Sequence, residues 1–484
     1  MSRRFEIPQL QGIFAEPWSW KKLIGLLGVF GPAAIVASVA IGAGETIVVV
    51  RAGAWAGYDL LWLVLLSCIA KGIFVTYLIG RYTAVSGELI GHRVVRFPGP
   101  RGWLLMLILL MEFFAAPMGW VAISKPCGDL FHYILPLPDT FSEPVWENLI
   151  ATCFIGLALG LGIRLSYDKV EKQQLLICGI LVSGTIIGTM MVRPDFVKAL
   201  VGTFSFGHFP DFPSWAPEDA VKHRMLTMAT TFGYVGGSVM AYVVYANWVG
   251  MHRWGLNSHA QIEEIRDHAF TRERVDYLPE DPESVSRLRR LCAPLRWDVS
   301  MGAVVLFIVT AAFMLSGAAV LMPLQSRFEG WSLLTNQAHV WATIHPTLVW
   351  IYYVCVIAAL WGSLQALPEI YARVTHEFLQ SIWPGREWSF MAVKKSICLY
   401  IFLVTMVFVW LNIPFNILIQ IAGFLFANFA IALVMVVVLY LNFMLPAVYR
   451  TGLPMLVGAV LSAAVLILFA VISGWGLARK LIGF

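Results

Sequence analysis

Long apolar stretches recur along almost the whole chain and are separated by shorter polar segments. A run of about 20 apolar residues is long enough to cross the hydrocarbon core of a bilayer as a helix. The pattern therefore indicates an all-α polytopic membrane protein. We predict eleven spans, at residues 23–52, 58–82, 102–124, 147–165, 174–193, 225–250, 299–322, 346–370, 394–411, 414–441 and 453–477.

The composition and the motifs restrict the possible functions of the protein. Only 13% of the 484 residues are charged, against about a quarter in soluble domains. The seven cysteines are scattered and form no C-x-x-C pair, which argues against a metal cage or a disulfide framework. The chain has no phosphate-binding loop and no Ser/His/Asp or H-E-x-x-H arrangement. We therefore expect neither an enzyme nor ATP-driven transport by this chain, and no cofactor.

The basic residues predict the orientation. Segment 1–22 lacks the apolar core of a signal peptide, so we expect it to remain on the protein. Most of the 34 lysines and arginines fall on the N-terminal side of the membrane, many of them in the loop 251–297. The positive-inside rule then predicts a multi-pass protein of the cell (inner) membrane, with a cytoplasmic N-terminus and an extracytoplasmic C-terminus. The basic charge follows from this topology, and we expect no nucleic-acid partner.

Two of the predicted spans are interrupted by glycine. The stretch "VASVAIGAGETIVVV", residues 36–50, holds Gly42 and Gly44 at its middle, directly before Glu45. Five spans later, "TTFGYVGGSVMAY" carries glycines before Met240. Unwound backbone is tolerated inside a membrane only where it lines a cavity or is buried in protein. Paired breaks at matched positions are typical of an inverted-repeat secondary transporter with its site at the midplane. The alternative is that both are ordinary small-residue packing faces.

Four stretches resemble one known family. They are "GPAAIVASVAIGAGE", "GYVGGSVMAY", "SYDKVEKQQLLI" and "ILIQIAGFLFANF". Over residues 20–445 the chain resembles the Nramp (natural resistance-associated macrophage protein) divalent-metal transporters. The resemblance implies a leucine-transporter-like fold with two inverted five-helix repeats plus an eleventh helix, and with helices 1 and 6 unwound at mid-membrane.

This resemblance gives the expected domain organisation. A cytoplasmic N-terminal segment precedes the first five-helix repeat, an extracellular loop joins it to the second repeat, and an eleventh helix follows. The expected boundaries are 1–22, 23–193, 194–224, 225–441 with the cytoplasmic insert 251–297, and 442–484.

The resemblance also places the substrate site, in an altered form. The family's Asp-Pro-Gly-Asn is replaced by Gly42-Ala43-Gly44-Glu45, and its Met-Pro-His-Asn by Met240-Ala241-Tyr242-Val243. Gln420 stands where the family's tenth helix carries a glutamine. Substrate or ion binding is therefore expected at Gly42, Ala43, Gly44, Glu45, Met240, Ala241, Tyr242 and Gln420, with Glu45, Met240 and Gln420 as the metal ligands. Met240 also has a plain packing interpretation.

Three ionisable residues lie deep inside predicted spans: Glu45, Lys71 and Glu112. A charge at this depth needs a partner, a cavity or a function. Glu45 either binds a cation or only caps the second half of its broken helix. Lys71 either pairs with Glu112 or Glu45, or acts in coupling together with Glu112. Two carboxylates and one ammonium leave a net charge of −1, which suits one cation.

The expected function is a secondary active transporter that moves a cation by alternating access. A divalent metal of the Mn, Mg, Ca or Fe class is the expected cargo, with a coupling ion as a further partner and the protein acting as a monomer in the lipid bilayer. Hard oxygen ligands around Glu45 favour Mn, Mg or Ca over softer ions. Two alternatives stay open. One is a transporter of a small organic solute or anion on the same scaffold, and the other is a non-transporting sensor that retains the fold.

Overall fold

The computed structural model describes residues 5–9, 14, 16, 19–271, 274–325 and 330–482. Helices make up the regular structure of these residues, and no strand occurs among them. The first half contains α1 (Trp20–Leu27), α2 (Pro32–Ala40), η2 (Gly44–Val49), α3 (Val50–Ala56), α4 (Leu61–Ser67), η3 (Cys68–Val75), α5 (Thr76–Ser86), α6 (Ile90–Val94), α7 (Trp103–Ile134), α8 (Glu143–Arg164), α9 (Tyr167–Val192), α10 (Phe196–Phe204) and α11 (Glu218–Lys222).

The second half repeats the pattern of one broken helix followed by long ones. It contains α12 (Arg224–Tyr234), α13 (Val239–Met251), η4 (Gly255–Ser258), α14 (Ile262–Thr271), α15 (Pro282–Leu291), α16 (Ala293–Ser316), η5 (Gly317–Leu321), η6 (Met322–Leu324), α17 (Leu333–Ile344), α18 (Pro346–Ile382), α19 (Phe390–Leu411), α20 (Phe415–Ala422), η7 (Gly423–Phe429), α21 (Ala430–Met444), η8 (Ala447–Tyr449) and α22 (Leu453–Ile482).

Within the described ranges, nine helices are long and apolar enough to cross a membrane. A tenth span is the bent pair α2 and η2–α3, whose halves meet at 48°. These ten correspond to ten of the eleven predicted spans. The remaining one, 225–250, consists of α12 and α13, which are not among these ten spans.

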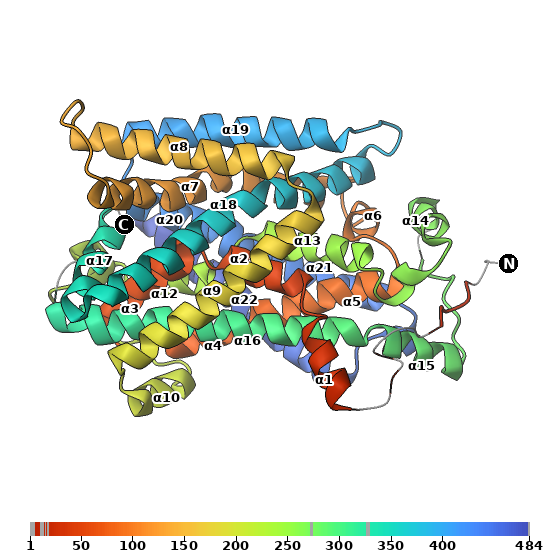
Figure 1. Ribbon diagram of the computed structural model, residues 1–484. Helices are drawn as coiled ribbons and strands as arrows, with labels where there is room; N and C mark the ends of the chain where they lie inside the picture. Colours follow the sequence, from red (N-terminus) through yellow and green to blue (C-terminus); the bar gives the residue numbers. More distant parts are fainter. Residues whose placement is uncertain are drawn as a thin grey trace.

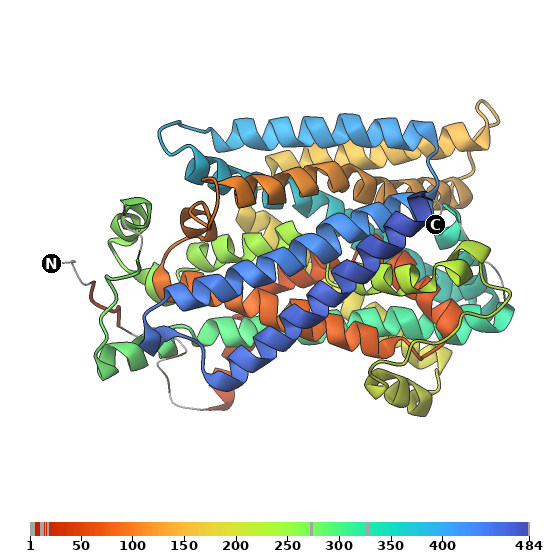
Figure 2. The same ribbon diagram turned by 180° about the vertical axis from the view of Figure 1, so that it is seen from behind.

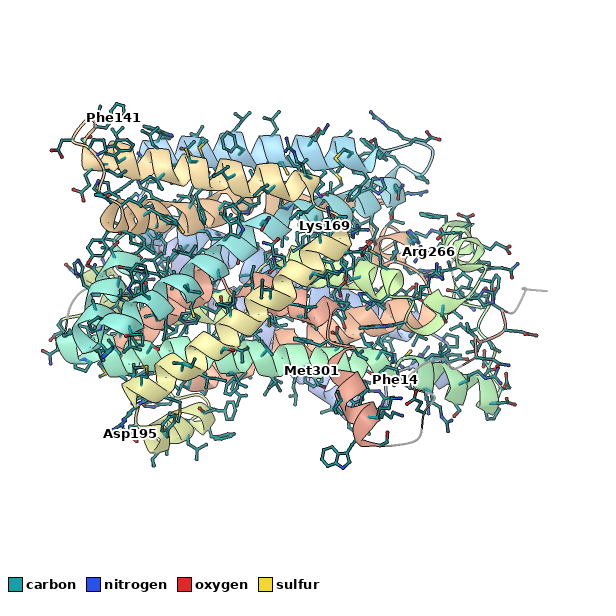
Figure 3. The ribbon with its side chains drawn as sticks, viewed as in Figure 1. Phe14, Phe141, Lys169, Asp195, Arg266 and Met301 are labelled. Atoms are coloured by element: carbon teal, nitrogen blue, oxygen red, sulfur yellow. The ribbon has the colours of Figure 1, made fainter. Side chains whose placement is uncertain are left out.

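The long helices run between two ends of the bundle (Figure 1). α10 and α17 lie at one end, and α6, α14 and α15 lie at the other. Figure 2 shows α22 running diagonally across the opposite face and finishing at the end where α17 lies. Figure 3 places Asp195 at that same end and Arg266 at the opposite one. The segment at Phe5, which donates its backbone N–H to Tyr277, therefore lies at the opposite end from Ile482.

The outer faces of the bundle are apolar. Large side chains such as Leu157 on α8, Leu176 on α9 and Val471 on α22 are each more than 60% exposed. Apolar surface of this extent is typical of a protein surrounded by lipid rather than by water.

A buried carboxylate fixes where the first broken helix begins. Asp298 on α16 accepts the backbone N–H groups of Gly31 and Ala33, each at 2.9 Å, and the Tyr245 hydroxyl at 2.8 Å. The first N–H groups of a helix have no partner within the helix, and Pro32 at the first position suits this geometry. Asp298 thereby holds α2 against α16 and α13, with its far end at the middle of the bundle.

Candidate functional site

The first break separates α2 from the π-helical segment η2. Ile41 leaves the helical region with φ −76° and ψ 82°, and the backbone becomes helical again at Gly44. The Ser363 hydroxyl on α18 lies 2.9 Å from the Val39 carbonyl oxygen and 3.4 Å from that of Ile41. The Thr46 hydroxyl donates to the Gly42 carbonyl at 2.8 Å. Uncharged hydroxyl groups therefore cap the carbonyls that this break releases.

The sixth-span break separates α12 from α13 and needs glycine for its backbone shape. Gly236 and Gly237 have φ values of +100° and +79°, a region that other residues rarely adopt. The Tyr242 hydroxyl, on the first turn of α13, donates to the Gly236 carbonyl. Tyr242 thus closes the break locally.

A lysine completes the capping of the sixth-span break. The Lys71 ammonium, from the π-helical segment η3, donates to the Phe232 carbonyl at 2.8 Å and the Gly233 carbonyl at 2.7 Å. The Ser67 hydroxyl, one turn earlier, donates to the Val235 carbonyl at 2.9 Å. Of the two alternatives for Lys71, the ion pair with Glu112 or Glu45 is wrong, because the ammonium binds carbonyl oxygens at the end of α12 instead. A role in coupling stays a prediction.

Glu45 connects the two breaks. Its fully buried carboxylate accepts the Gly42 backbone N–H at 3.2 Å through one oxygen and the Gly236 N–H at 3.3 Å through the other. Each oxygen of an ionised carboxylate can accept a further contact. The side chain therefore links the two repeats at their unwound points and retains capacity to contact a cation.

A cavity of about 80 Å³ lies between the two breaks. A single water needs at least about 10–15 Å³ of such space, so the cavity has room for a small ion with a few waters. The Tyr234 hydroxyl is buried and has no hydrogen-bond partner in the described part of the chain. The wall combines small residues with aromatic rings: Gly42, Ala43, Gly44, Ala116, Gly119, Gly237, Ala241, Ser238, Ser363, Trp120, Tyr234, Tyr371 and Phe426.

Glu112 stands behind this wall rather than in it. The carboxylate, fully buried on α7, accepts a hydrogen bond from the Tyr371 hydroxyl and interacts with the Ser238 hydroxyl. Both hydroxyl residues line the cavity. Glu112 therefore contacts the cavity through two of its wall residues.

The structure separates the predicted site residues into two groups. Gly42, Ala43, Gly44 and Ala241 line the cavity. Glu45 is not among the lining residues but hydrogen-bonds to the backbone of both breaks, next to the lining residue Gly44. Met240 and Tyr242 are fully buried on α13 and do not line the cavity.

Gln420 lies in a different polar cluster. Its side-chain oxygen accepts from the Lys480 ammonium at 2.9 Å, and Lys480 also pairs with Asp219 at 2.6 Å. The cluster joins the tenth span to α22 and α11, and Gln420 is not among the residues that line the cavity.

Sequence reasoning missed the aromatic part of the wall. Trp120 lies two helical turns after Glu112 on α7, and Tyr371 lies two turns after Ser363 on α18. Both sit within apolar spans, where an aromatic residue usually indicates packing. A usable signal was the 3.6-residue spacing, which puts Trp120 on the same helix face as Glu112.

No group of three or more His, Cys, Asp or Glu side chains in the described part of the chain is arranged to hold a metal ion. A divalent ion in the cavity would therefore have few carboxylate, imidazole or thiolate ligands. Mg²⁺-like ions accept this arrangement because they retain several waters.

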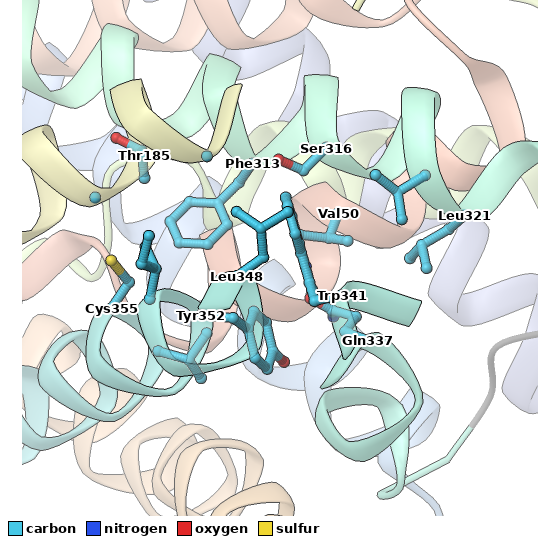
Figure 4. A pocket seen from close by; sticks show the side chains of 15 residues that line it. Val50, Thr185, Phe313, Ser316, Leu321, Gln337, Trp341, Leu348, Tyr352 and Cys355 are labelled. Atoms are coloured by element: carbon cyan, nitrogen blue, oxygen red, sulfur yellow. The ribbon is translucent and has the colours of Figure 1, made fainter. Parts of the chain in front are cut away.

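A second, apolar pocket lies beside the first broken span (Figure 4). Phe313, Leu348 and Trp341 form much of its wall, between α16, α17 and α18. Gln337 of α17 donates from this wall to the Thr46 carbonyl at 3.1 Å. α17 is thus tied directly to the segment that follows the first break, although this pocket does not reach the breaks themselves.

Comparison with known families matches residues 33–476 to the family described as "Natural resistance-associated macrophage protein-like". The chain belongs to the Nramp family. Its members are transporters, and the chain is a multi-pass membrane protein of this kind. Comparison with curated protein sequences gives no match.

Solved structures agree on the fold. A manganese transporter of Eremococcus coleocola, in complex with an aromatic bis-isothiourea compound, is 13% identical with a TM-score of 0.68, covering 97% of this chain and 90% of that one. Mhp1, a nucleobase-cation-symport-1 family transporter with bromovinylhydantoin bound, is 14% identical with a TM-score of 0.50, covering 93% of each chain. MhsT in complex with L-phenylalanine is 14% identical with a TM-score of 0.50, covering 90% of this chain and 98% of that one. The Nramp chain therefore has the leucine-transporter fold.

Proposed function

We propose that this Nramp protein is a secondary active transporter that moves a cation through the cavity between its two helix breaks. The observation that carries the proposal is Glu45, whose carboxylate bridges Gly42, a residue of the cavity wall, and Gly236 of the other break. Because each break joins two half-helices, the halves can tilt about it and open the cavity to one side at a time. Alternating access follows from this arrangement.

The buried charges favour a positively charged cargo. Glu45, Glu112 and Lys71 are all fully buried in the centre of the bundle. With all three ionised their net charge is −1, and the Lys71 charge is already satisfied by carbonyl oxygens. A cation entering the cavity would restore neutrality in a region of low dielectric constant, where an uncompensated charge is expensive.

A divalent metal ion is the first candidate cargo. The manganese transporter of E. coleocola shares the fold over almost the full length of both chains. Since few protein ligands converge here, we propose that the ion keeps part of its water shell. Glu45 then supplies a hard oxygen, which favours Mn²⁺ or Mg²⁺ over softer ions.

We further propose that the Arg266 end of the bundle is cytoplasmic. The loop 251–297 at this end is rich in arginine, and the positive-inside rule assigns such segments to the cytoplasm. α17 and α10 then lie on the extracytoplasmic side.

A small organic solute is the second candidate, and the composition of the cavity wall favours it. The wall is mainly small and aromatic residues, and the cavity of about 80 Å³ must widen to admit such a solute. Two proteins with the same fold were solved with bromovinylhydantoin and with L-phenylalanine bound. Aromatic walls of this kind also attract organic cations.

Uptake into proteoliposomes separates these candidates. The purified protein is reconstituted, and uptake of Mn²⁺ and Mg²⁺ is compared with uptake of labelled amino acids and nucleobases. We expect saturable uptake of the divalent ions and loss of at least tenfold in Glu45→Gln. Glu263→Gln, which changes a largely exposed carboxylate of α14, is the matched control and should transport normally. Uptake of an organic solute alone would support the second candidate. Unchanged metal uptake in Glu45→Gln would exclude the proposed role of Glu45.

A further inference from the structure

Lys71 occupies a position that an inorganic cation could fill. Its ammonium nitrogen lies 2.8 Å from the Phe232 carbonyl oxygen and 2.7 Å from the Gly233 carbonyl oxygen, and the side chain is fully buried. These carbonyls end α12, where the helix dipole is negative. Converging carbonyl oxygens at such an end are the usual ligands of a bound cation in a broken-helix transporter.

The surroundings of the ammonium are also those of a cation site. The Ser67 hydroxyl lies 3.1 Å from the Phe232 carbonyl, and the Phe232 ring stands 4.9 Å from the Lys71 nitrogen. Glu45 attracts Lys71 through space without forming an ion pair with it. Oxygen atoms, a ring face and one distant carboxylate therefore surround the charge.

A hydrogen-bond donor alone does not explain this residue. The Val235 and Gly236 carbonyls of the same break are capped by neutral hydroxyls of Ser67 and Tyr242. A charged group at mid-membrane depth is costlier than a hydroxyl by several kcal/mol. The charge itself must therefore serve a purpose at the end of α12.

We propose that Lys71 is a tethered cation, held permanently at the sixth-span break in place of an exchangeable monovalent ion. With Lys71 present, the Phe232 and Gly233 carbonyls bind no free ion. The transported cargo is then confined to the Glu45 side of the cavity, and no inorganic cation is required at this break for the fold to be stable. The inference concerns a different position from the cargo site and holds whatever the cargo is.

Removal of the side chain tests the proposal through a gain of ion dependence. Lys71→Ala leaves both carbonyls without a partner and leaves room for an ion, whereas Lys71→Met fills the same space with an apolar chain. Apparent unfolding midpoints of the full chain in detergent are measured in NaCl, KCl and choline chloride at equal ionic strength. Lys125→Ala is the matched control, because it removes another buried lysine, bound to Asn412, that contacts neither break.

The expected results differ for each variant. The wild type and Lys125→Ala should show the same midpoint in all three salts. Lys71→Ala should be destabilised in choline chloride and gain about 5 °C in NaCl, as binding of an ion to the native state predicts. Lys71→Met should be destabilised equally in all salts.

Three outcomes would overturn the proposal. One is a Lys71→Ala midpoint that is the same in every salt, including failure to fold in all of them. Another is an equal Na⁺ effect in Lys125→Ala, which would show a general salt effect. The third is wild-type stability of Lys71→Met, which would show that no charge is needed at this break.

Discussion

Both helix breaks release backbone carbonyl groups, but different side chains cap these carbonyls at each break. At the first break, the hydroxyls of Ser363 and Thr46 cap the released carbonyls, and all the capping groups are neutral. At the sixth-span break the Lys71 ammonium binds the carbonyls that end α12. One break is therefore capped without a positive charge, and the other is capped with one.

The unequal charge of the two breaks determines where a cation can bind. A cation is repelled by the ammonium at the sixth-span break and is attracted by the Glu45 carboxylate that begins η2. The glycines differ in a parallel way. Gly44 is required because a Cβ there would lie 2.7 Å from the Tyr234 carbonyl oxygen, whereas Gly237 is required for its φ of +79°. The first break is built for close approach and the second for an unusual backbone shape.

The largest effect on stability is expected at Gly237. In Gly237→Ala the new methyl group must adopt the left-handed region and would meet the Ala40 backbone at 3.2 Å. The two penalties together predict a loss of about 3 kcal/mol. The measurement is the unfolding midpoint of the purified variant. A loss below about 1 kcal/mol would show that the break relaxes freely and that its contact with α2 is not tight.

A smaller loss is expected at the first break. Gly44→Ala has no unfavourable φ, so only close contacts with the Tyr234 carbonyl and side chain oppose it. Overpacking of this kind typically costs about 1–3 kcal/mol, and we expect a loss of about 2 kcal/mol. Measured side by side, the two variants test the comparison directly. A larger loss for Gly44→Ala than for Gly237→Ala would reverse the assignment of the two glycine roles.

The smallest effect is expected at Gln420. Because its side chain is bound to Lys480 and does not line the cavity, Gln420→Ala should change divalent-ion uptake by less than about twofold, a difference of under 0.5 kcal/mol in transition-state stabilisation. Glu45→Gln, assayed in the same proteoliposomes, provides the contrasting loss. A tenfold loss in Gln420→Ala would restore the ligand role that the family resemblance implies.

Much of the fold could be predicted from the sequence, because it depends on local patterns of apolar residues and glycines. Apolar length predicted the spans, and Gly42, Gly44, Gly236 and Gly237 predicted both breaks, since glycine and unwinding are directly linked.

The site could be predicted from the sequence only in part, because it depends on which side chains from distant parts of the chain come into contact. Nothing along the chain shows that Lys71 reaches the Phe232 carbonyl, 161 positions away, or that Ser363 caps α2. A buried lysine is as compatible with a carboxylate partner as with carbonyls, and the alternatives predicted from sequence were a carboxylate partner or a coupling role. The binding role of Gln420 was inferred from the family resemblance. The residues around Gln420 give no sign that its side chain binds Lys480 on α22.

The position of a bound ion distinguishes a cargo site near Glu45 from one at the Lys71 carbonyls. Crystals of the full chain grown or soaked with Mn²⁺ give an anomalous scattering peak at each ordered manganese. We expect one peak in the cavity between the breaks, on the side of Gly42 and Glu45, with the Lys71 ammonium still on its two carbonyls. A peak at the Phe232 and Gly233 carbonyls with Lys71 displaced, or a peak coordinated by Met240 and Gln420, would contradict this expectation.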